Sequence, residues 1–302
     1  MIAKGVADAE EVDAVGENAV LDENLISVLP AGSKVVNVAY SGMSAWVRTL
    51  KIDVELPDGS TESYFKKGAP GNRGREMMKG AFESESLVYS FIPDHVPKPV
   101  AWGTYKSKPN MHFYLCHFQD MTDDLPDPAR FGAMLARLHR RSMGKSPAGR
   151  YGFHAPTHLA FIPNDNSWAD TWTEWFSGAM LRMFTEEEKS QGHDEELDLL
   201  KTALLDKVIP RLLRPMETGG HAIQPCLCHS DVWPGNVKRD AADGKIVFFD
   251  SCGFWGHHES DLGCCKAPRY SLGRPYVEEY FKNIPVSEPA EDFEDRHALY
   301  AL

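Results

Sequence analysis

The sequence predicts an α+β protein with two lobes, a small antiparallel β-sheet lobe that carries one helix and a larger, mainly helical lobe after it. Before about residue 118, short runs rich in β-branched and aromatic residues alternate with turn residues. After that point, apolar residues recur at the i, i+3, i+4 and i+7 spacing of helices with one buried face. A chain of 302 residues is long enough for each lobe to bury its own core. We therefore expect a loosely ordered lead-in at 1–22, a first lobe at 23–118 and a second lobe at 119–302.

The composition is that of an ordinary globular protein, with 42% hydrophobic and 25% charged residues. A net charge of −12 disfavours nucleic acid and anionic membrane surfaces as partners. No run approaches the roughly 20 apolar residues of a membrane-spanning helix, and the acidic N-terminal stretch lacks the pattern of a secretory signal. Six cysteines in such a chain are expected to be reduced thiols, so the cytoplasm is the expected compartment and a monomer the default assembly.

Three strands are expected early in the first lobe, at 35–40, 45–54 and 63–67. A loop of small residues that includes Ser41 and Gly42 joins the first two strands. In kinases a loop at this place covers the phosphates of ATP. Only Gly42 is a glycine, so the loop lacks the Gly-x-Gly-x-x-Gly pattern, and a polar hairpin without nucleotide is the alternative.

Lys67 ends the third strand, at the place where kinases carry the lysine that pairs with the nucleotide phosphates. Apolar residues at helical spacing then predict a helix over 73–91. A kinase needs one glutamate on this helix to hold the lysine, and Glu83 and Glu85 are the candidates. A carboxylate on a solvated helix face would give the same pattern.

Beyond this helix, strands are expected at 100–103 and 112–118, with the hinge between the lobes near 116–119. The connection at 149–166 is too long for a plain turn and is a candidate substrate-facing segment.

The last of the helices expected in the second lobe has no stop signal, so a truncated C-terminus is one interpretation. Apolar periodicity predicts the helices of the second lobe at 131–139, 168–176, 197–212, 258–266, 276–283 and 291–302, with the aromatic stripe of Trp168, Trp172, Trp175 and Phe176 in the core.

One stretch of the second lobe carries the strongest functional pattern. His229, Asp231 and Asn236 have the spacing of the kinase catalytic loop, in which an Asp follows a His by two residues and precedes an Asn by five. Asp231 would accept the proton of an attacking hydroxyl group during phosphoryl transfer from Mg-ATP. The apolar run 246–249 predicts a buried strand that ends at Asp250, so Asn236 and Asp250 are placed to hold the metal on the phosphates. The residues after Asp250 depart from the Asp-Phe-Gly of protein kinases, which argues against that family.

Two other interpretations of this stretch remain open. Asp and Asn beside Pro-Gly often bond only to the backbone of a turn, although His229 and the strand that ends at Asp250 favour catalysis. Zinc binding is less favoured, because no Cys-x-x-Cys pair is present. Its candidate ligands are Cys226, Cys228, His229, His257 and His258.

Taken together, these residues resemble the fructosamine kinase (ketosamine-3-kinase) family, close to its fungal branch, over most of 35–302. Only the catalytic loop is shared with aminoglycoside and choline kinases. The resemblance rests on the segments 96–99, 137–139, 151–154, 229–236, 247–250 and 256–259.

The resemblance implies a bilobal, protein-kinase-like fold that transfers the γ-phosphate of ATP, with Mg²⁺, to the sugar 3-hydroxyl of a ketoamine. Ribulosyl-lysine or fructosyl-lysine, in glycated proteins or as small ketosamines, would be the substrate, and the activity would repair glycated proteins. Asp231 would be the base, and Asn236 and Asp250 the Mg²⁺ ligands. The implied nucleotide contacts are Lys67 on the phosphates, Glu83 to orient it, Ser41 and Gly42 in the covering loop, and Leu115, Cys116, His117 and Phe118 along the adenine.

Two alternatives stay open at this point. A small-molecule kinase of the aminoglycoside or choline kinase type would use the same constellation with different substrate loops. An ATP-binding pseudokinase that serves as an interaction module is suggested by the missing loop glycines and by Ser230, which stands where the family usually has glycine. A Cβ beside Asp231 would strain the loop if the φ of Ser230 is positive.

Overall fold

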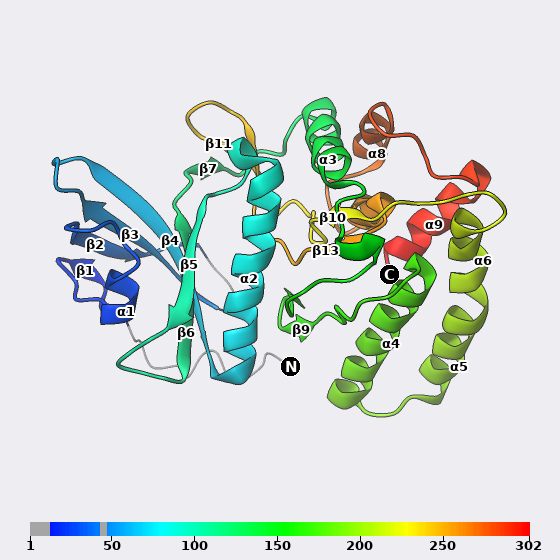
Figure 1. Ribbon diagram of the computed structural model, residues 1–302, viewed down its shortest axis with the longest axis horizontal. Helices are drawn as coiled ribbons and strands as arrows, with labels where there is room; N and C mark the ends of the chain where they lie inside the picture. Colours follow the sequence, from blue (N-terminus) through cyan, green and yellow to red (C-terminus); the bar gives the residue numbers. More distant parts are fainter. Residues whose placement is uncertain (1–12, 43–46) are drawn as a thin grey trace.

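The computed structural model describes residues 13–42 and 47–302, and it places an antiparallel sheet beside a mostly helical part (Figure 1). The sheet has six strands in the order β1-β2-β3-β4-β6-β5, and every neighbouring pair is antiparallel. The mixed α+β class predicted from the sequence is confirmed. The strands of this sheet are β1 (Gly16–Glu17), β2 (Lys34–Tyr40), β3 (Arg48–Glu55), β4 (Thr61–Pro70), β5 (Pro99–Thr104) and β6 (Met111–His117).

The two faces of the sheet carry different side chains because side chains alternate along a strand. Helix α2 (Gly71–Phe91) packs on β4, β5 and β6 and lies between the sheet and the helical part (Figure 1). On the face toward α2, Ala69, Tyr114 and Cys116 form an apolar cluster with Met78 of the helix. The opposite face carries a second cluster that includes Ile52, Phe113 and Leu115, together with residues of the short helix α1 (Glu23–Ile26).

Two expectations about the N-terminal region need correction. The strand predicted at 45–54 is observed as β3 from Arg48, and residues 45 and 46 lie outside the described part of the chain. The predicted loose lead-in, as far as it is described, belongs to the sheet, because Gly16–Glu17 pairs with β2 as an edge strand. Asp13 is buried as well, where it accepts a bond of 2.6 Å from the ammonium group of Lys66.

The helical part has a single large apolar core. Helix α3 begins with Pro128 behind an Asp127 side chain that caps the amide of Arg130, and its buried stripe includes Phe131 and Leu138, as predicted. Trp172, Trp175 and Phe176 of the aromatic stripe are confirmed as core, with Trp172 fully buried, whereas Trp168 lies before the helix and is only partly buried. The helices are α3 (Pro128–Ser142), α4 (Trp172–Gln191), α5 (Glu195–Ala203), α6 (Ile209–Leu213), α7 (Gly263–Lys266), α8 (Arg274–Phe281) and α9 (Phe293–Tyr300).

The helix predicted over 197–212 is interrupted, since a π-helical turn at Leu204–Val208 joins α5 to α6. Short strands in this part carry the catalytic stretch: β10 pairs with β13, and β12, β11 and β7 form a three-stranded sheet. No helix among the described residues combines the length and the apolarity that a membrane span needs. The remaining strands are β7 (Met121–Thr122), β8 (His158–Leu159), β9 (Ile162–Pro163), β10 (Cys226–Cys228), β11 (Val237–Asp240), β12 (Ile246–Phe248) and β13 (Phe254–Gly256).

Candidate active site

The predicted catalytic residues follow the ends of two short strands. His229, Ser230 and Asp231 come directly after β10, and Asn236 lies immediately before β11. Strand β12 pairs with β11 and leads into Asp250. The backbone N–H of Phe249 donates to the carbonyl of Asn236 at 3.1 Å, so the two predicted metal ligands lie on adjoining segments.

Asp231 and Asn236 are in direct contact. The amide nitrogen of Asn236 donates to Oδ2 of Asp231 at 2.7 Å and to the carbonyl of Asp231 at 3.1 Å. The loop between them is closed by backbone bonds from Trp233 to Asp231 and from Asn236 to Trp233. The bond from Asn236 to the carbonyl of Asp231 is of the side-chain-to-backbone kind that the turn interpretation predicts. The bond to Oδ2 also fixes the carboxylate of Asp231 in one orientation.

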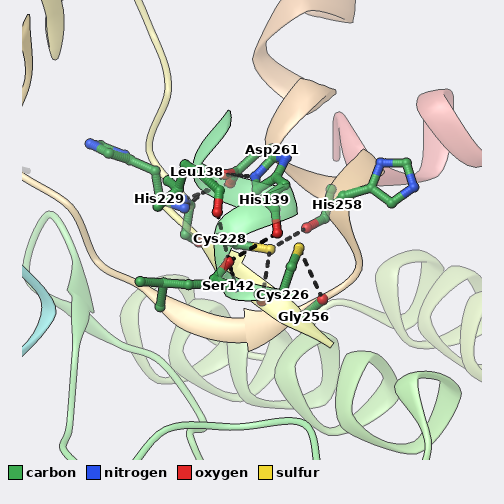
Figure 2. A network of polar contacts seen from close by, with 12 residues as sticks. Leu138, His139, Ser142, Cys226, Cys228, His229, Gly256, His258 and Asp261 are labelled. Carbon is green, nitrogen blue, oxygen red and sulfur yellow. Dashed lines mark hydrogen bonds and ion pairs between the residues drawn. The ribbon is translucent and has the colours of Figure 1, made fainter. Parts of the chain in front are cut away.

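Asp261 anchors the catalytic loop from within the helical core. Its buried carboxylate accepts the backbone N–H groups of His229 and Ser230, each at 2.7 Å (Figure 2). Ser230 has φ of 71°, a left-handed conformation that costs a residue with a Cβ about 1–2 kcal/mol. Hydrogen bonds to a carboxylate are strong enough to offset such a cost. Sequence reasoning missed Asp261, because nothing in its local pattern distinguishes it from an exposed acidic residue.

The structure brings together two of the predicted site residues, Lys67 and Asp250. The ammonium group of Lys67 is ion-paired with Oδ1 of Asp250 and lies 5.2 Å from the ring centroid of Tyr114. Burial alone would lower the pKa of Lys67, but the charge of Asp250, supported by Glu85, outweighs burial and raises it. The Asp250 side chain keeps 56% of its surface exposed and has φ of 60°.

The glutamate beside Lys67 is Glu85, and the expectation that Glu83 orients the lysine needs correction. The Glu83 carboxylate contacts Nε2 of His154 at 3.1 Å, on a partly exposed face of α2. Glu85 is buried, and its carboxylate accepts the N–H of Ser251 at 2.8 Å, directly after Asp250. The helix presents Glu85 and not Glu83 to the site because Glu85 follows buried Met78 by seven residues, and i and i+7 share one helix face.

Helix α2 also holds the segment after Asp250 through Ser84. The hydroxyl of Ser84 accepts the N–H of Gly253 at 2.8 Å and lies 2.6 Å from the hydroxyl of Ser251. A Cβ on Gly253 would come within 2.8 Å of the Ser84 oxygen, so the close approach requires glycine. The position of α2 is therefore linked to the position of Asp250. Sequence reasoning did not identify Ser84.

The pKa values of the two aspartates of the site, Asp231 and Asp250, are shifted in opposite directions. Burial, together with repulsion from Asp250, raises the pKa of Asp231 to about 7, although the bond from Asn236 opposes the rise. The positive charge of Lys67, which is also hydrogen-bonded to Asp250, lowers the pKa of Asp250. Asp250 therefore stays ionised, while Asp231 can take up a proton near neutral pH. Such a difference suits one carboxylate for charge stabilisation and the other for general base catalysis.

Of the β6 residues expected to contact the nucleotide, only some have side chains on the face of the sheet that carries Lys67. Cys116 faces that side, in the cluster with α2. The side chain of Leu115 lies in the opposite cluster, and the His117 ring packs 5.0 Å from the ring of Tyr64, which belongs to that cluster too. Because alternate side chains of a strand point to opposite faces, Leu115 and His117 cannot line a site on the Lys67 side with their side chains. Phe118 lies beyond β6 with Lys51 over its ring at 4.7 Å.

The covering loop is described only up to Gly42. Ser41 donates its backbone N–H to Thr49 at 3.3 Å, and Gly42 has φ of 73°, which favours glycine. The rest of the expected loop, 43–44, lies outside the described residues. Ser41 and Gly42 thus join β2 to β3 as expected, and their contact with phosphate stays a prediction.

The chemistry of Asn236 and Asp250 fits a magnesium ion, which prefers carboxylate and amide oxygens. Asn236 turns its amide nitrogen to Asp231, so its amide oxygen is the atom left for a cation. Lys67 contacts Oδ1 of Asp250, so Oδ2 can serve the same cation. The two ligands come from segments that the Phe249 backbone bond already joins.

The chain is similar to a known protein family and to individual members of it. The sequence model of the family described as fructosamine kinase matches residues 51–302. A mouse (Mus musculus) ketosamine-3-kinase is 31% identical over 249 residues, which cover 76% of each chain. A chloroplastic protein-ribulosamine 3-kinase of rice (Oryza sativa subsp. indica) is 28% identical over 246 residues, which cover 80% of this chain but only 65% of the rice protein.

A solved structure shows the same fold. A protein of Thermobifida fusca that is provisionally assigned as a fructosamine-3-kinase superposes with a TM-score of 0.65 at 23% identity. The superposition covers 93% of this chain and 91% of the other. The sheet, helix α2 and the helical part therefore follow an architecture that is already known.

Proposed function

Because the chain belongs to the fructosamine kinase family, we propose that it transfers the γ-phosphate of ATP to the sugar 3-hydroxyl of a ketoamine. Ribulosyl-lysine and fructosyl-lysine, in glycated proteins or as small ketosamines, are the proposed acceptors, and repair of glycated proteins is the proposed role. The observation that carries the proposal is the arrangement of Asp231, held by Asn236, beside an Asp250 that is paired with Lys67.

Asp231 is the proposed general base. A sugar hydroxyl is a weak nucleophile at neutral pH, and a carboxylate about 3 Å away can accept its proton as the new phosphate bond forms. The pKa of about 7 makes Asp231 a stronger base than an ordinary carboxylate. Since Asn236 donates to Oδ2 of Asp231, Oδ1 is the atom proposed to accept the proton of the acceptor hydroxyl.

Lys67 is proposed to bind the phosphates of ATP, with Glu85 holding it in place. Its raised pKa keeps it charged at physiological pH. Asn236 and Asp250 would hold Mg²⁺, which when bound neutralises charge on the transferred phosphoryl group. Lys67 would exchange its contact with Asp250 for one with the phosphates.

Several finer assignments belong to the same proposal. We expect residues 23–118 to bind the nucleotide and residues 119–302 to bind the acceptor. Ser41 and Gly42 would approach the phosphates, and Cys116 the adenine. All six cysteines are unpaired, which is what a reducing compartment such as the cytoplasm would produce.

The test is ADP release by the purified chain with Mg-ATP and separate acceptors: ribulosyl-lysine, fructosyl-lysine, choline and an aminoglycoside. We expect turnover with the ketoamines and its loss in Asp231→Asn. A matched control is Asp123→Asn, since Asp123 is a fully exposed aspartate that pairs with Lys238. Turnover confined to choline or the aminoglycoside would overturn the proposed substrate. ATP binding without turnover of any acceptor would favour the pseudokinase alternative.

A further inference from the structure

Three buried histidines of the helical part use both of their ring nitrogens in hydrogen bonds to other side chains. They are His139, His257 and His258, and none serves the proposed chemistry directly. Figure 2 shows His139 beside the loop anchor Asp261, the thiols of β10 below them, and His258 to the right. Potential metal ligands do lie close together here, in one group of His139, Cys226 and Cys228 and in another of His257, His258 and Glu259, but every ring nitrogen of the three histidines already has a hydrogen-bond partner. His139 has its potential ligand atom within 4.8 Å of the Cys226 and Cys228 sulfurs, but Tyr280 and Asp261 occupy both of its nitrogens.

The contacts of these histidines form one continuous series, which we call the buried relay. It joins the indole of α4 to the anchor of the catalytic loop through side chains that are far apart in sequence. The relay begins at Trp172 Nε1, which contacts Tyr300 OH (2.8 Å), and Tyr300 OH contacts His257 Nδ1 (2.9 Å). Ser287 Oγ then joins His257 Nε2 (2.8 Å) to His258 Nε2 (3.1 Å). Tyr280 OH joins His258 Nδ1 (3.0 Å) to His139 Nδ1 (2.7 Å), and His139 Nε2 ends the relay at Asp261 Oδ2 (3.0 Å).

The two ends of the relay fix the direction of every bond in it. The indole N–H of Trp172 can only donate, and the carboxylate of Asp261 can only accept. Each hydroxyl and each neutral imidazole between them has one hydrogen to give. Seven contacts therefore share seven hydrogens, and only one assignment satisfies them all. His257 and His139 must carry the proton on Nε2, and His258 must carry it on Nδ1.

The surroundings of His257 and His258 favour neutral rings, while Cys226 and Asp261 raise the pKa of His139 in spite of its burial, so the assignment holds at a pH where His139 is neutral. Burial, with the positive charge of Arg296 among the further causes, lowers the pKa of His257 and His258 well below its ordinary value. At the other end, Asp261 uses the same Oδ2 for His139 and for the backbone N–H of His229. The relay thus ends on the atoms that hold the catalytic loop.

We propose that the buried relay positions the catalytic base, and that Tyr280 and His139 are positioning residues that act through Asp261. This proposal rests on the proposed role of Asp231. With its proton on Nδ1, His139 would direct a lone pair at the Asp261 carboxylate from 3.0 Å. Two acceptors at that distance repel each other, and the carboxylate would turn away from the N–H groups of His229 and Ser230. Ser230, at φ of 71°, would then lose the bond that compensates its strain.

The first test is direct and needs no activity. Nitrogen-15 spectra of histidine-labelled protein distinguish the Nδ1–H tautomer, the Nε2–H tautomer and the charged ring. They are assigned by single histidine replacements and recorded at pH 8, because Asp261 and Cys226 raise the pKa of His139 in spite of its burial. We expect Nε2–H for His139 and His257 and Nδ1–H for His258. Any other tautomer, or a charged ring at that pH, would overturn the relay even if the enzyme is fully active.

The second test asks whether the relay serves catalysis. Tyr280→Phe removes one relay hydroxyl, and Tyr276→Phe is its matched control, because Tyr276 lies on the same helix and donates its hydroxyl to the carbonyl of Pro126, outside the relay. In Tyr280→Phe we expect kcat for the ketoamine to fall about tenfold with the KM for ATP nearly unchanged. Tyr276→Phe should keep both values.

The outcomes separate this proposal from the proposed function. If Tyr280→Phe changes the His139 tautomer but keeps its kcat, the relay has no role in positioning. If the wild-type chain turns over no ketoamine, the proposed function fails while the tautomers still decide the relay. Should Tyr280→Phe not fold, Ser287→Ala interrupts the relay at a hydroxyl farther from the loop, and the same loss of kcat is expected.

Discussion

Replacement of Asp231 by Asn is expected to abolish turnover and, at the same time, to stabilise the folded protein above neutral pH. The carboxylate of Asp231 is held in a partly buried place next to Asp250, which raises its pKa from 3.8 to about 7. Asparagine has nearly the same shape and can still accept the bond from Asn236, but it carries no charge. The substitution therefore removes the base and also the unfavourable charge.

The size of the effect follows from the pKa. Between pH 3.8 and pH 7 the folded protein keeps a proton on Asp231 that the unfolded chain has lost, so the associated stability is complete below 3.8 and disappears as pH rises through 7. One pKa unit corresponds to about 1.4 kcal/mol, so the two units between pH 5 and pH 7 give at most roughly 3 kcal/mol. Solvent screening of a partly exposed group reduces this to about 1–2 kcal/mol.

Urea unfolding of the wild type and of Asp231→Asn at pH 5 and at pH 8 measures this difference. We expect the difference in the free energy of unfolding, variant minus wild type, to be larger at pH 8 than at pH 5 by about 1–2 kcal/mol. Asp123→Asn, at an exposed site, should show no such change. An equal effect of Asp231→Asn at both pH values would refute the raised pKa and with it the account of Asp231 as a tuned base.

Three further predictions concern neighbouring positions. Glu85→Gln should raise the KM for ATP and lower kcat, because a buried carboxylate beside Lys67, the proposed phosphate ligand, is lost, whereas Glu83→Gln should stay near wild type in steady-state assays. The reverse ranking would contradict the observed helix face. Gly80→Ala should lower Tm by several degrees, because its Cβ would lie 1.9 Å from a backbone oxygen of the facing loop. Gly178→Ala is the control: its Cβ would make ordinary contact at 3.7 Å, so it should be neutral or stabilising by about 1 kcal/mol. Equal Tm changes in the two variants would refute the close contact at Gly80. Ser230→Gly should raise the free energy of unfolding by about 1 kcal/mol and retain turnover, since the φ of 71° at this position favours glycine. A loss of stability in this variant would show that the loop is unstrained.

The parts of the site that depend on local spacing could be predicted from the sequence. Asp231, Asn236 and Asp250 lie on one short stretch, and the turn and strand between them fix their relative places. Lys67 followed from its place at the end of a strand before a helix. These elements need little information from distant residues.

The choice between Glu83 and Glu85 depended on which face of α2 meets the site. Buried Met78, Glu85 and Val88 share one face by helical spacing, and this signal was available in the sequence. It was ambiguous because the acidic residues around them give the helix a polar appearance. The same difficulty affected β6, where the apolar residues on both faces of the strand hid the direction of Leu115.

Contacts between distant segments could not be predicted from the sequence. Asp261 lies about thirty residues after the loop that it anchors, and only the pairing of β10 with β13 brings the two together. Ser84 reaches the segment after Asp250 across more than 160 residues. In both cases the partner is a backbone N–H group, which every residue except proline carries, so the residue types give no sign of the pairing.

The measurement that tests the central claim most directly is mass spectrometry of a peptide that carries one ribulosyl-lysine, incubated with Mg-ATP and the wild-type chain or Asp231→Asn. The account predicts that the wild type adds one phosphoryl group to the sugar 3-hydroxyl and that unmodified lysine is later recovered. Asp231→Asn should bind ATP and leave the peptide unchanged. A phosphoryl group on another position, or equal phosphorylation by the variant, would contradict the assignment of Asp231 as the base of a ketoamine 3-kinase.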